Sequence, residues 1–200
     1  MRWNKHSRLE GEHAFLGAST YSWLNYSEDK LVDKYYNYLA TLKGTRLHDL
    51  AAKLIEERVE LPDRDTTFNM YVNDAIYYNM RPEQKLYYSD NCFGTADAIV
   101  FDERDYFLRI HDLKTGINPA SLHQLEVYAA LFFLEYDIPV KDTEIELRIY
   151  QNNDVIIGNP GVVDIAPIMD KIVSFDKIIE EIKGEQRWSM DGSRTSRIQE

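Results

Sequence analysis

The sequence predicts one α/β domain in which helices flank a central β-sheet. Helical stripes of apolar residues and segments of alternating polarity follow one another along the 200 residues. A segment between Gly94 and Gly116 is typical of a β-hairpin. We expect residues 1–184 to form this domain. Residues 185–200 are polar and lack periodicity, so a flexible tail is expected there.

Composition excludes several classes of protein. No stretch approaches the roughly 18 apolar residues of a membrane span, and the first residues lack the apolar core of a signal peptide. We therefore expect a cytoplasmic protein with no membrane partner. The single cysteine, Cys92, excludes an internal disulfide, a cysteine-based zinc site and a cysteine-ligated iron–sulfur cluster. The net charge of −11 argues against coating nucleic acid through bulk charge, but it leaves room for a nuclease with a carboxylate-lined metal site.

Helices are predicted in the first quarter of the chain. A short helix is expected to begin near Ser19 or Thr20. Ser27 is the predicted N-cap of a second helix, which would run to about Leu42. Gly44 is expected to end that helix.

A third helix is predicted from the N-cap Thr45 to a point before Pro62. Its apolar stripe consists of Leu47, Leu50, Ala51, Leu54 and Ile55. His48 lies about 20° from Ile55 around the helix, at the margin of that stripe. A histidine in this position is either packed and hydrogen-bonded or a ligand at the edge of a cleft.

Helical stripes and alternating polarity also predict the elements away from the hairpin. Helices are expected over residues 67–80 and 167–183. Strands are expected over residues 84–88, 144–150 and 154–157, and the second of these alternates cleanly between apolar and polar positions.

A helix after the hairpin is predicted from the N-cap Asn118 and Pro119 to about Tyr136. It is apolar on most sides, which is typical of a helix packed on two faces. Its polar exceptions, Gln124 and Tyr128, are four residues apart and so share one face.

The hairpin carries Asp97 on one arm, with Asp112 and Lys114 on the other. If residues 102–105 connect the arms, Asp97 lies opposite Ile110 and diagonally across from Asp112, on one face of the sheet. A slip of one residue in this register would separate the two carboxylates.

Such a cluster is suited to phosphodiester hydrolysis. Asp97 and Asp112 could ligate Mg²⁺ or Mn²⁺, which lowers the pKa of a bound water. Lys114 could orient that water and stabilise negative charge, while Gly94 and Gly116 would allow a close approach of the backbone. Alternatively, the aspartates are turn residues at strand ends and the lysine pairs with one of them. Spacing alone does not decide, because an acidic residue two positions before a lysine occurs four times in this chain.

Four motifs in order resemble the PD-(D/E)XK nuclease superfamily, and most of all its RecB-like branch of phage-type exonucleases and CRISPR-adaptation nucleases. They are Gly44-Thr45-Arg46-Leu47-His48, Gly94-Thr95-Ala96-Asp97, Asp112-Leu113-Lys114 and Gln124-Leu125-Glu126-Val127-Tyr128. The resemblance covers about residues 15–150. It implies a restriction-endonuclease-like core, in which a central mixed β-sheet is flanked by α-helices.

The resemblance implies a role for each matching residue. His48, Asp97, Asp112 and the Leu113 carbonyl would be the metal ligands, which turns His48 from a packed residue into a ligand. Glu83 would match a further acidic position.

Catalysis, by the same resemblance, would involve Asp97, Asp112 and Lys114. Gln124 and Tyr128 would line the site and contact the DNA backbone. The cofactor would be Mg²⁺ or Mn²⁺, and the four cysteines that hold an iron–sulfur cluster in several members are absent here.

The function expected from these residues is that of a metal-dependent deoxyribonuclease. An exonuclease acting on DNA ends in recombination, repair or phage DNA metabolism is the first expectation, with DNA and a recombination or replication protein as partners. An endonuclease on the same core, or a catalytically silent DNA- or protein-binding subunit, is the alternative. Strand polarity and oligomeric state are left open.

Overall fold

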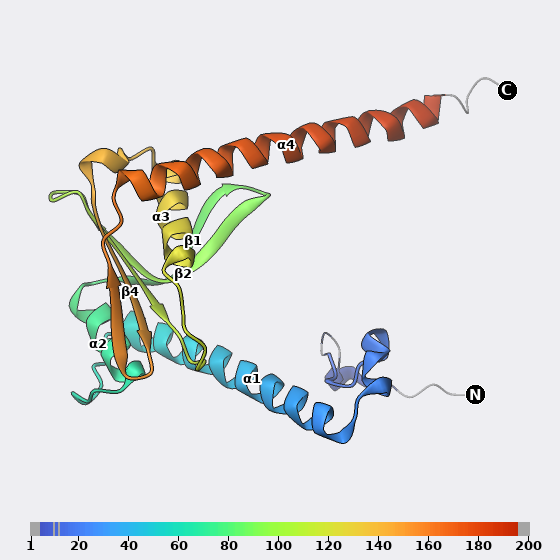
Figure 1. The fold of residues 1–200 in the computed structure, drawn as a ribbon, viewed down its shortest axis with the longest axis horizontal. Coiled ribbons are helices and arrows are strands. Elements are labelled where there is room, and N and C mark those ends of the chain that lie inside the picture. The colour runs from blue at the N-terminus through green and yellow to red at the C-terminus, as the bar shows by residue number, and fades with distance from the viewer. Residues whose placement is uncertain (1–4, 10, 12, 196–200) are drawn as a thin grey trace. The chain divides into compact units, whose positions relative to one another are not determined.

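The computed structural model describes residues 5–9, 11 and 13–195 (Figure 1). The chain forms two compact units, Met1–Leu47 and His48–Glu200. The second unit contains the sheet and every residue singled out above as a site candidate, so the site is described within that unit.

The first unit contains two short 3₁₀ helices, η1 (Ser7–Leu9) and η2 (Ala18–Asn25), and the start of the long helix α1 (Glu28–Glu56). The expected short helix near Ser19 is therefore present as η2. Ser27 caps α1 as predicted, because its Oγ accepts a hydrogen bond from the Lys30 N–H at 3.3 Å. Phe15 packs on Tyr35 and Tyr38 of α1, with ring centroids 5.2 Å away in each case.

The predicted break at Gly44 is wrong, because α1 continues through it into the second unit. Thr45 is no N-cap; its hydroxyl donates to the Thr41 carbonyl at 3.2 Å, within the helix. A glycine inside a helix costs only about 1 kcal/mol relative to alanine. The last turns of α1 bury Ala51 and Ile55, which stabilises the helix beyond the glycine.

A five-stranded mixed sheet forms the centre of the second unit, which confirms the predicted α/β class. The strand order is β1-β2-β3-β4-β5, with β1 Arg81–Ser89, β2 Cys92–Asp102, β3 Phe107–Leu113, β4 Glu144–Gln151 and β5 Asp154–Gly158. Neighbouring strands are antiparallel except for β3 and β4, which are parallel. Parallel neighbours need a crossover, and here it consists of helix α3 (His123–Tyr136) and the short helix η3 (Val140–Asp142).

Helices cover both faces of this sheet (Figure 1). On one face, α3 and the start of α4 (Val162–Thr195) pack over a core that includes Leu86, Ile110, Leu125, Phe133 and Leu147. On the other face, α2 (Thr67–Tyr77) and the end of α1 pack over a core that includes Ala51, Tyr71, Val72, Leu113 and Tyr150. The predicted helix over residues 67–80 is thus present as α2.

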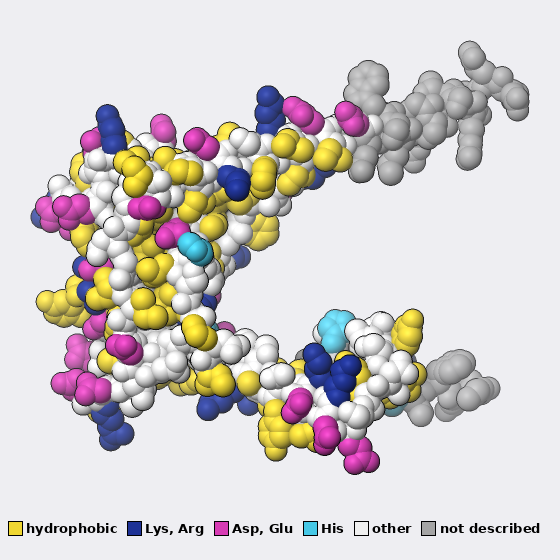
Figure 2. Space-filling model, viewed as in Figure 1, with side chains coloured by type: hydrophobic (Ala, Val, Ile, Leu, Met, Phe, Trp, Pro, Cys, Tyr) yellow, Lys and Arg dark blue, Asp and Glu magenta, His cyan; other side chains and the backbone are white. Residues whose placement is uncertain are grey.

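Helix α4 is longer than predicted at both ends. It begins at Val162, where the Asp164 carboxylate accepts a hydrogen bond from the Gly161 N–H at 2.9 Å, and it passes through Gly184 to Thr195. A helix that packing has already nucleated can continue through a polar segment, although Gly184 and Gly192 lie within it. Apolar side chains are visible along α4 (Figure 2), and the exposed ones include Val163, 78% exposed, and Phe175, 56% exposed.

Helix α3 begins at His123, four residues after the predicted first helical position at Pro119. The reason lies in the buried amide of Gln151 at the end of β4. Its Nε2 donates to the Gly116 and Asn118 carbonyls at 2.6 and 2.8 Å, and its Oε1 accepts from the Ala120 N–H at 3.2 Å. These three bonds hold the segment as a loop that bends over residues 116–118. None of the helices in the described residues is long and apolar enough to cross a membrane.

Candidate metal and catalytic site

The register of the β2–β3 hairpin differs from the predicted one by two residues. Ala98 pairs with His111 and Asp102 pairs with Phe107, so residues 103–106 form the connection. Asp102 accepts a hydrogen bond from the Arg104 N–H at 2.9 Å, which starts the turn one residue later than expected. By this register Asp97 is level with Asp112 rather than with Ile110. Because the shift is even, the two aspartates still share one face, as predicted.

Glu83 of β1 lies level with Asp97 on the neighbouring strand. Pro82 pairs with Ala98 and Gln84 with Ala96, and the ladder skips the residue between them. Glu83 has a φ of 49°, in the left-handed region that side chains other than glycine rarely adopt. Such conformations occur at functional sites more often than elsewhere.

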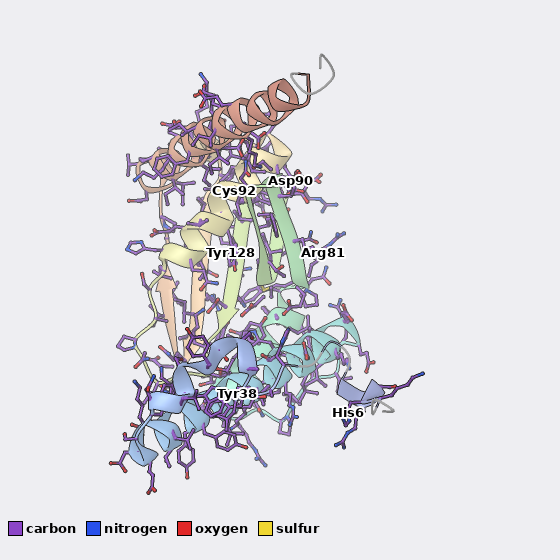
Figure 3. The ribbon with its side chains drawn as sticks, turned by 90° about the vertical axis from the view of Figure 1, so that its right-hand side faces the viewer. His6, Tyr38, Arg81, Asp90, Cys92 and Tyr128 are labelled. Atoms are coloured by element: carbon purple, nitrogen blue, oxygen red, sulfur yellow. The ribbon has the colours of Figure 1, made fainter. Side chains whose placement is uncertain are left out.

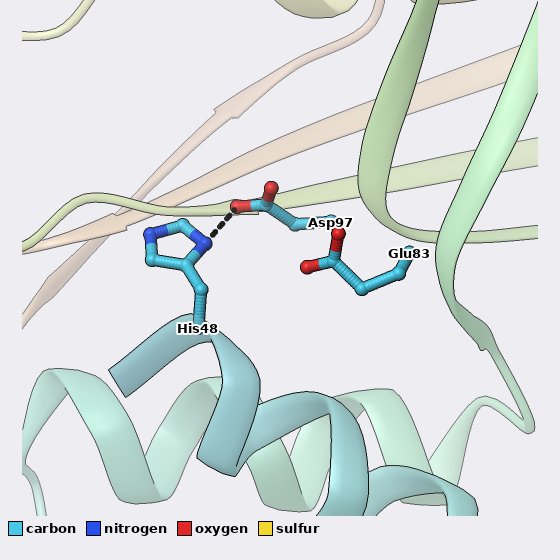
Figure 4. A group of neighbouring side chains, drawn as sticks. All are labelled: His48, Glu83 and Asp97. Carbon is cyan, nitrogen blue, oxygen red and sulfur yellow. Dashed lines mark ion pairs between the residues drawn. The ribbon is translucent and has the colours of Figure 1, made fainter. Parts of the chain in front are cut away.

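His48, Glu83 and Asp97 converge at this point (Figure 4). Each offers one ligand atom, and these atoms all lie within 4.8 Å of one another. His48 Nδ1 is 3.3 Å from Asp97 Oδ2. The same oxygen accepts a hydrogen bond from the backbone N–H of Leu113 at 2.9 Å. Residues from α1, β1 and β2 thus form one group, and β3 orients its central carboxylate.

Asp112 and Lys114 form an ion pair next to this group. Lys114 Nζ donates to Asp112 Oδ1 at 3.0 Å and lies 3.0 Å from Oδ2 as well. Asp112 is only 2% exposed, and its Oδ2, although 3.0 Å from the Lys114 ammonium, accepts no well-aligned hydrogen bond from the described residues. A cation or an ordered water could bind this oxygen in addition to the lysine.

Gln124 and Tyr128 continue the polar chain from Lys114. Gln124 Oε1 accepts from Lys114 Nζ at 2.8 Å, and Gln124 Nε2 donates to Tyr128 Oη at 2.9 Å. Tyr128 projects from α3 (Figure 3) and packs against the backbone of Gly94. A Cβ at Gly94 would lie 2.8 Å from Tyr128 Cε1, whereas one at Gly116 would meet no described atom within 4 Å. The expected close approach is therefore found at Gly94 and not at Gly116.

Repulsion between carboxylates shapes the electrostatics of the site. Burial raises the pKa of Glu83 and that of Asp112, and the negative charge of Asp97 raises both further. Lys114 opposes the shift of the Asp112 pKa. The pKa of His48 is raised mainly by its hydrogen bond to Asp97, although burial acts in the opposite direction. Three acidic groups with one lysine leave a surplus of negative charge that a divalent cation would compensate.

The residues present fit a hard divalent cation. Carboxylate oxygens with one imidazole are ligands that Mg²⁺ and Mn²⁺ accept. Of the predicted ligands, His48 and Asp97 meet in the group of three, while Asp112 lies beside it in its pair with Lys114. The ligand role of the Leu113 carbonyl stays a prediction, and the structure assigns the Leu113 N–H to the orientation of Asp97.

A second polar cluster lies on the opposite face of the sheet and was not predicted. Tyr150 Oη donates to Asp74 Oδ2 at 2.6 Å and lies 3.3 Å from His111 Nδ1. Arg148 also binds Asp74, at 3.2 Å. His111 is fully buried, and this burial, with the nearby charges of Arg148 and Arg109, holds its pKa well below the usual value. Its contacts connect α2, β3 and β4 through Asp74, His111 and Tyr150.

Comparison with known proteins gives no match: neither a family model, nor a curated protein, nor a solved structure matches the chain. Function is therefore argued from the site itself, from the residues that meet there and the chemistry that they allow.

Proposed function

We propose that this protein is a divalent-metal-dependent nuclease that hydrolyses phosphodiester bonds in DNA. The observation that carries the proposal is the placement of the Asp112–Lys114 ion pair beside the group formed by His48, Glu83 and Asp97. Phosphodiester hydrolysis needs a nucleophilic water and compensation of charge on the phosphoryl oxygens. The cluster offers groups for both tasks within one small region of the sheet.

The proposed fold is the restriction-endonuclease-like core of the PD-(D/E)XK superfamily, in its RecB-like branch. Three antiparallel strands followed by a parallel fourth, with helices on both faces, support this proposal. The ordered motifs support it as well, because His48 on α1, Asp97 on β2 and Asp112 on β3 come together although they are distant in sequence.

His48, Glu83 and Asp97 would hold the cation, with Asp112 Oδ2, which is ion-paired with Lys114, beside them. Bound Mg²⁺ or Mn²⁺ would lower the pKa of a water and neutralise charge on the phosphate. Leu113 fixes the Asp97 carboxylate through its N–H, so this ligand is oriented before a cation arrives.

Lys114 is proposed to orient the attacking water and to stabilise the developing charge. Two of its three N–H groups are directed at Asp112 Oδ1 and Gln124 Oε1. The ammonium also lies 3.0 Å from Asp112 Oδ2, so a bound water or phosphoryl oxygen would share it with that carboxylate. Tyr128 fixes Gln124 and thereby the position of the ammonium group.

The proposed substrate is the end of a DNA strand, and we place the reaction in recombination, repair or phage DNA metabolism. The net charge of −11 supports a site that engages one short stretch of strand rather than a surface that binds long DNA. A recombination or replication protein is the proposed partner, and an oligomer is compatible with the site.

A cleavage assay tests the proposal. The protein is incubated with Mg²⁺, Mn²⁺ or EDTA and with end-labelled linear single-stranded, linear duplex and circular DNA. Metal-dependent loss of linear DNA is expected, with circles intact. Lys114→Ala should abolish cleavage, whereas the matched control Lys141→Ala, an exposed lysine on η3, should not.

Cleavage of circles would show an endonuclease. No cleavage under either metal, or equal activity of Lys114→Ala, would exclude the mechanism.

A further inference from the structure

The loop between Lys114 and α3 is held at the edge of the proposed site. It starts at the catalytic lysine and ends just before Gln124, which binds that lysine's ammonium group. Both ends of the loop are thus fixed by site residues. Near the end of the loop, Ala120 and Leu122 pack against the core that α3 covers. Leu122 also lies directly against Gly158 of β5.

Gln151 anchors the middle of this loop. The amide nitrogen binds the carbonyls of Gly116 and Asn118, the two neighbours of Ile117, and the amide oxygen binds the Ala120 N–H. Gln151 is only 6% exposed, so the side chain is buried in order to hold the loop. A buried amide with this number of backbone partners restricts the loop to one conformation.

Ile117 is the residue that this anchor presents to solvent. It is 86% exposed, although its neighbours on both sides are bound through their carbonyls. An isoleucine in this position contributes no burial to the fold. The anchored loop thus holds an apolar side chain in solvent three residues after the catalytic lysine. A ligand that contacts this side chain does not have to order the loop first.

We propose that Ile117 contacts the face of a nucleobase beside the cleaved phosphate, and that the site therefore prefers a strand whose bases are unpaired. This inference rests on the proposed nuclease function. Charged groups of the site are suited to the phosphate, so within a bound strand an apolar side chain at its edge gains burial against a base or sugar. In a duplex the faces of the bases are stacked on one another, and only an unpaired base offers its face.

The test compares Ile117→Ser with Ile157→Ser, which changes a 52% exposed isoleucine on β5. Rates are measured on single-stranded DNA and on blunt duplex DNA of the same sequence. The unaltered protein should prefer the single strand. Ile117→Ser should lower kcat/KM on the single strand about five- to tenfold, mainly through KM, as expected for loss of one apolar contact. Its rate on duplex DNA should stay within about twofold, and Ile157→Ser should change neither rate.

Gln151→Leu provides a second variant, which removes the anchor and leaves Ile117 in place. It should show the same selective loss on single-stranded DNA, because without the anchor the loop must lose conformational entropy when Ile117 binds the base. Circular dichroism and a urea midpoint for each variant separate a loss of folding from a loss of contact.

Binding gives a readout that does not depend on turnover. Anisotropy of a fluorescein-labelled single strand is measured with Lys114→Ala and with Lys114→Ala combined with Ile117→Ser. Weaker binding of the double variant supports the inference even if the metal conditions give no cleavage, a result that would count against the proposed function alone. Equal binding, or equal losses on single-stranded and duplex DNA, would overturn the role of Ile117.

Discussion

Gly94→Ala tests the chain of contacts that holds Lys114. The new Cβ would lie 2.8 Å from Tyr128 Cε1 and 3.5 Å from Cδ1. Carbon atoms in favourable contact are about 3.5–4.0 Å apart, so the ring has to move away by roughly 1 Å. An aromatic ring packed on a strand has no flexible end that could give way, so the displacement reaches the hydroxyl group.

The consequence is transmitted through two hydrogen bonds. Tyr128 Oη accepts from Gln124 at 2.9 Å, and Gln124 accepts from Lys114 at 2.8 Å. Misplacement of a catalytic group by about 1 Å can reduce a rate by roughly 100-fold. We expect kcat to fall between about 10- and 100-fold, with a loss of stability of about 1–3 kcal/mol from overpacking.

The assay is steady-state cleavage of linear DNA, with urea unfolding of the same preparations. Gly116→Ala is the matched control, because a Cβ there would meet no described atom within 4 Å. Tyr128→Ala should already be slow, and adding Gly94→Ala to it should have little further effect, since the clash is gone. A Gly94→Ala protein that cleaves as fast as the parent, or losses that add in the double variant, would refute the reasoning.

Three further predictions follow from the site and the cluster behind it. His48→Ala should abolish cleavage at low metal concentration and leave the urea midpoint nearly unchanged, because the side chain is 29% exposed; global unfolding would instead indicate a packed histidine. Glu83→Gln should weaken Mn²⁺ binding about 10-fold in calorimetry, and an unchanged affinity would remove Glu83 from the ligand set. The pKa of His111 is depressed in the folded state, so below about pH 6.5 the unfolded state binds a proton that the folded state does not. The free energy of unfolding therefore decreases as pH falls, by at most about 1.4 kcal/mol for each pH unit. His111→Phe should flatten this loss in urea unfolding between about pH 7 and 5, and an unchanged slope would contradict it.

Local sequence patterns predicted the elements better than their ends. Ser27, the strand over residues 144–150 and the helix over residues 67–80 follow from capping and periodicity, and all three are present. Gly44 and Asn118 misled the prediction because remote groups decide their conformation. Burial of Ala51 and Ile55 carries α1 past Gly44, and the Gln151 amide keeps Asn118 out of α3.

The site was predictable only in part for a related reason. Alternation along the strands places Asp97 and Asp112 on one face in any register with an even shift. The prediction that they lie close together is therefore correct although the predicted β2–β3 register is wrong by two residues. Glu83 depends on the register of β1 with β2 and on a left-handed residue within a strand. Its one local signal, an acidic residue after a proline at the start of a strand, does not specify that geometry.

The central claim is that His48, Glu83 and Asp97 hold a divalent cation beside the Asp112–Lys114 pair. Crystals grown with Mn²⁺ and measured for anomalous scattering test it most directly. The account predicts one strong peak within bonding distance of Asp97 and His48, with Glu83 or Asp112 as a further ligand, and loss of that peak in Asp97→Asn. A map without a peak between these side chains, or with Mn²⁺ bound only elsewhere on the acidic surface, would contradict the assignment.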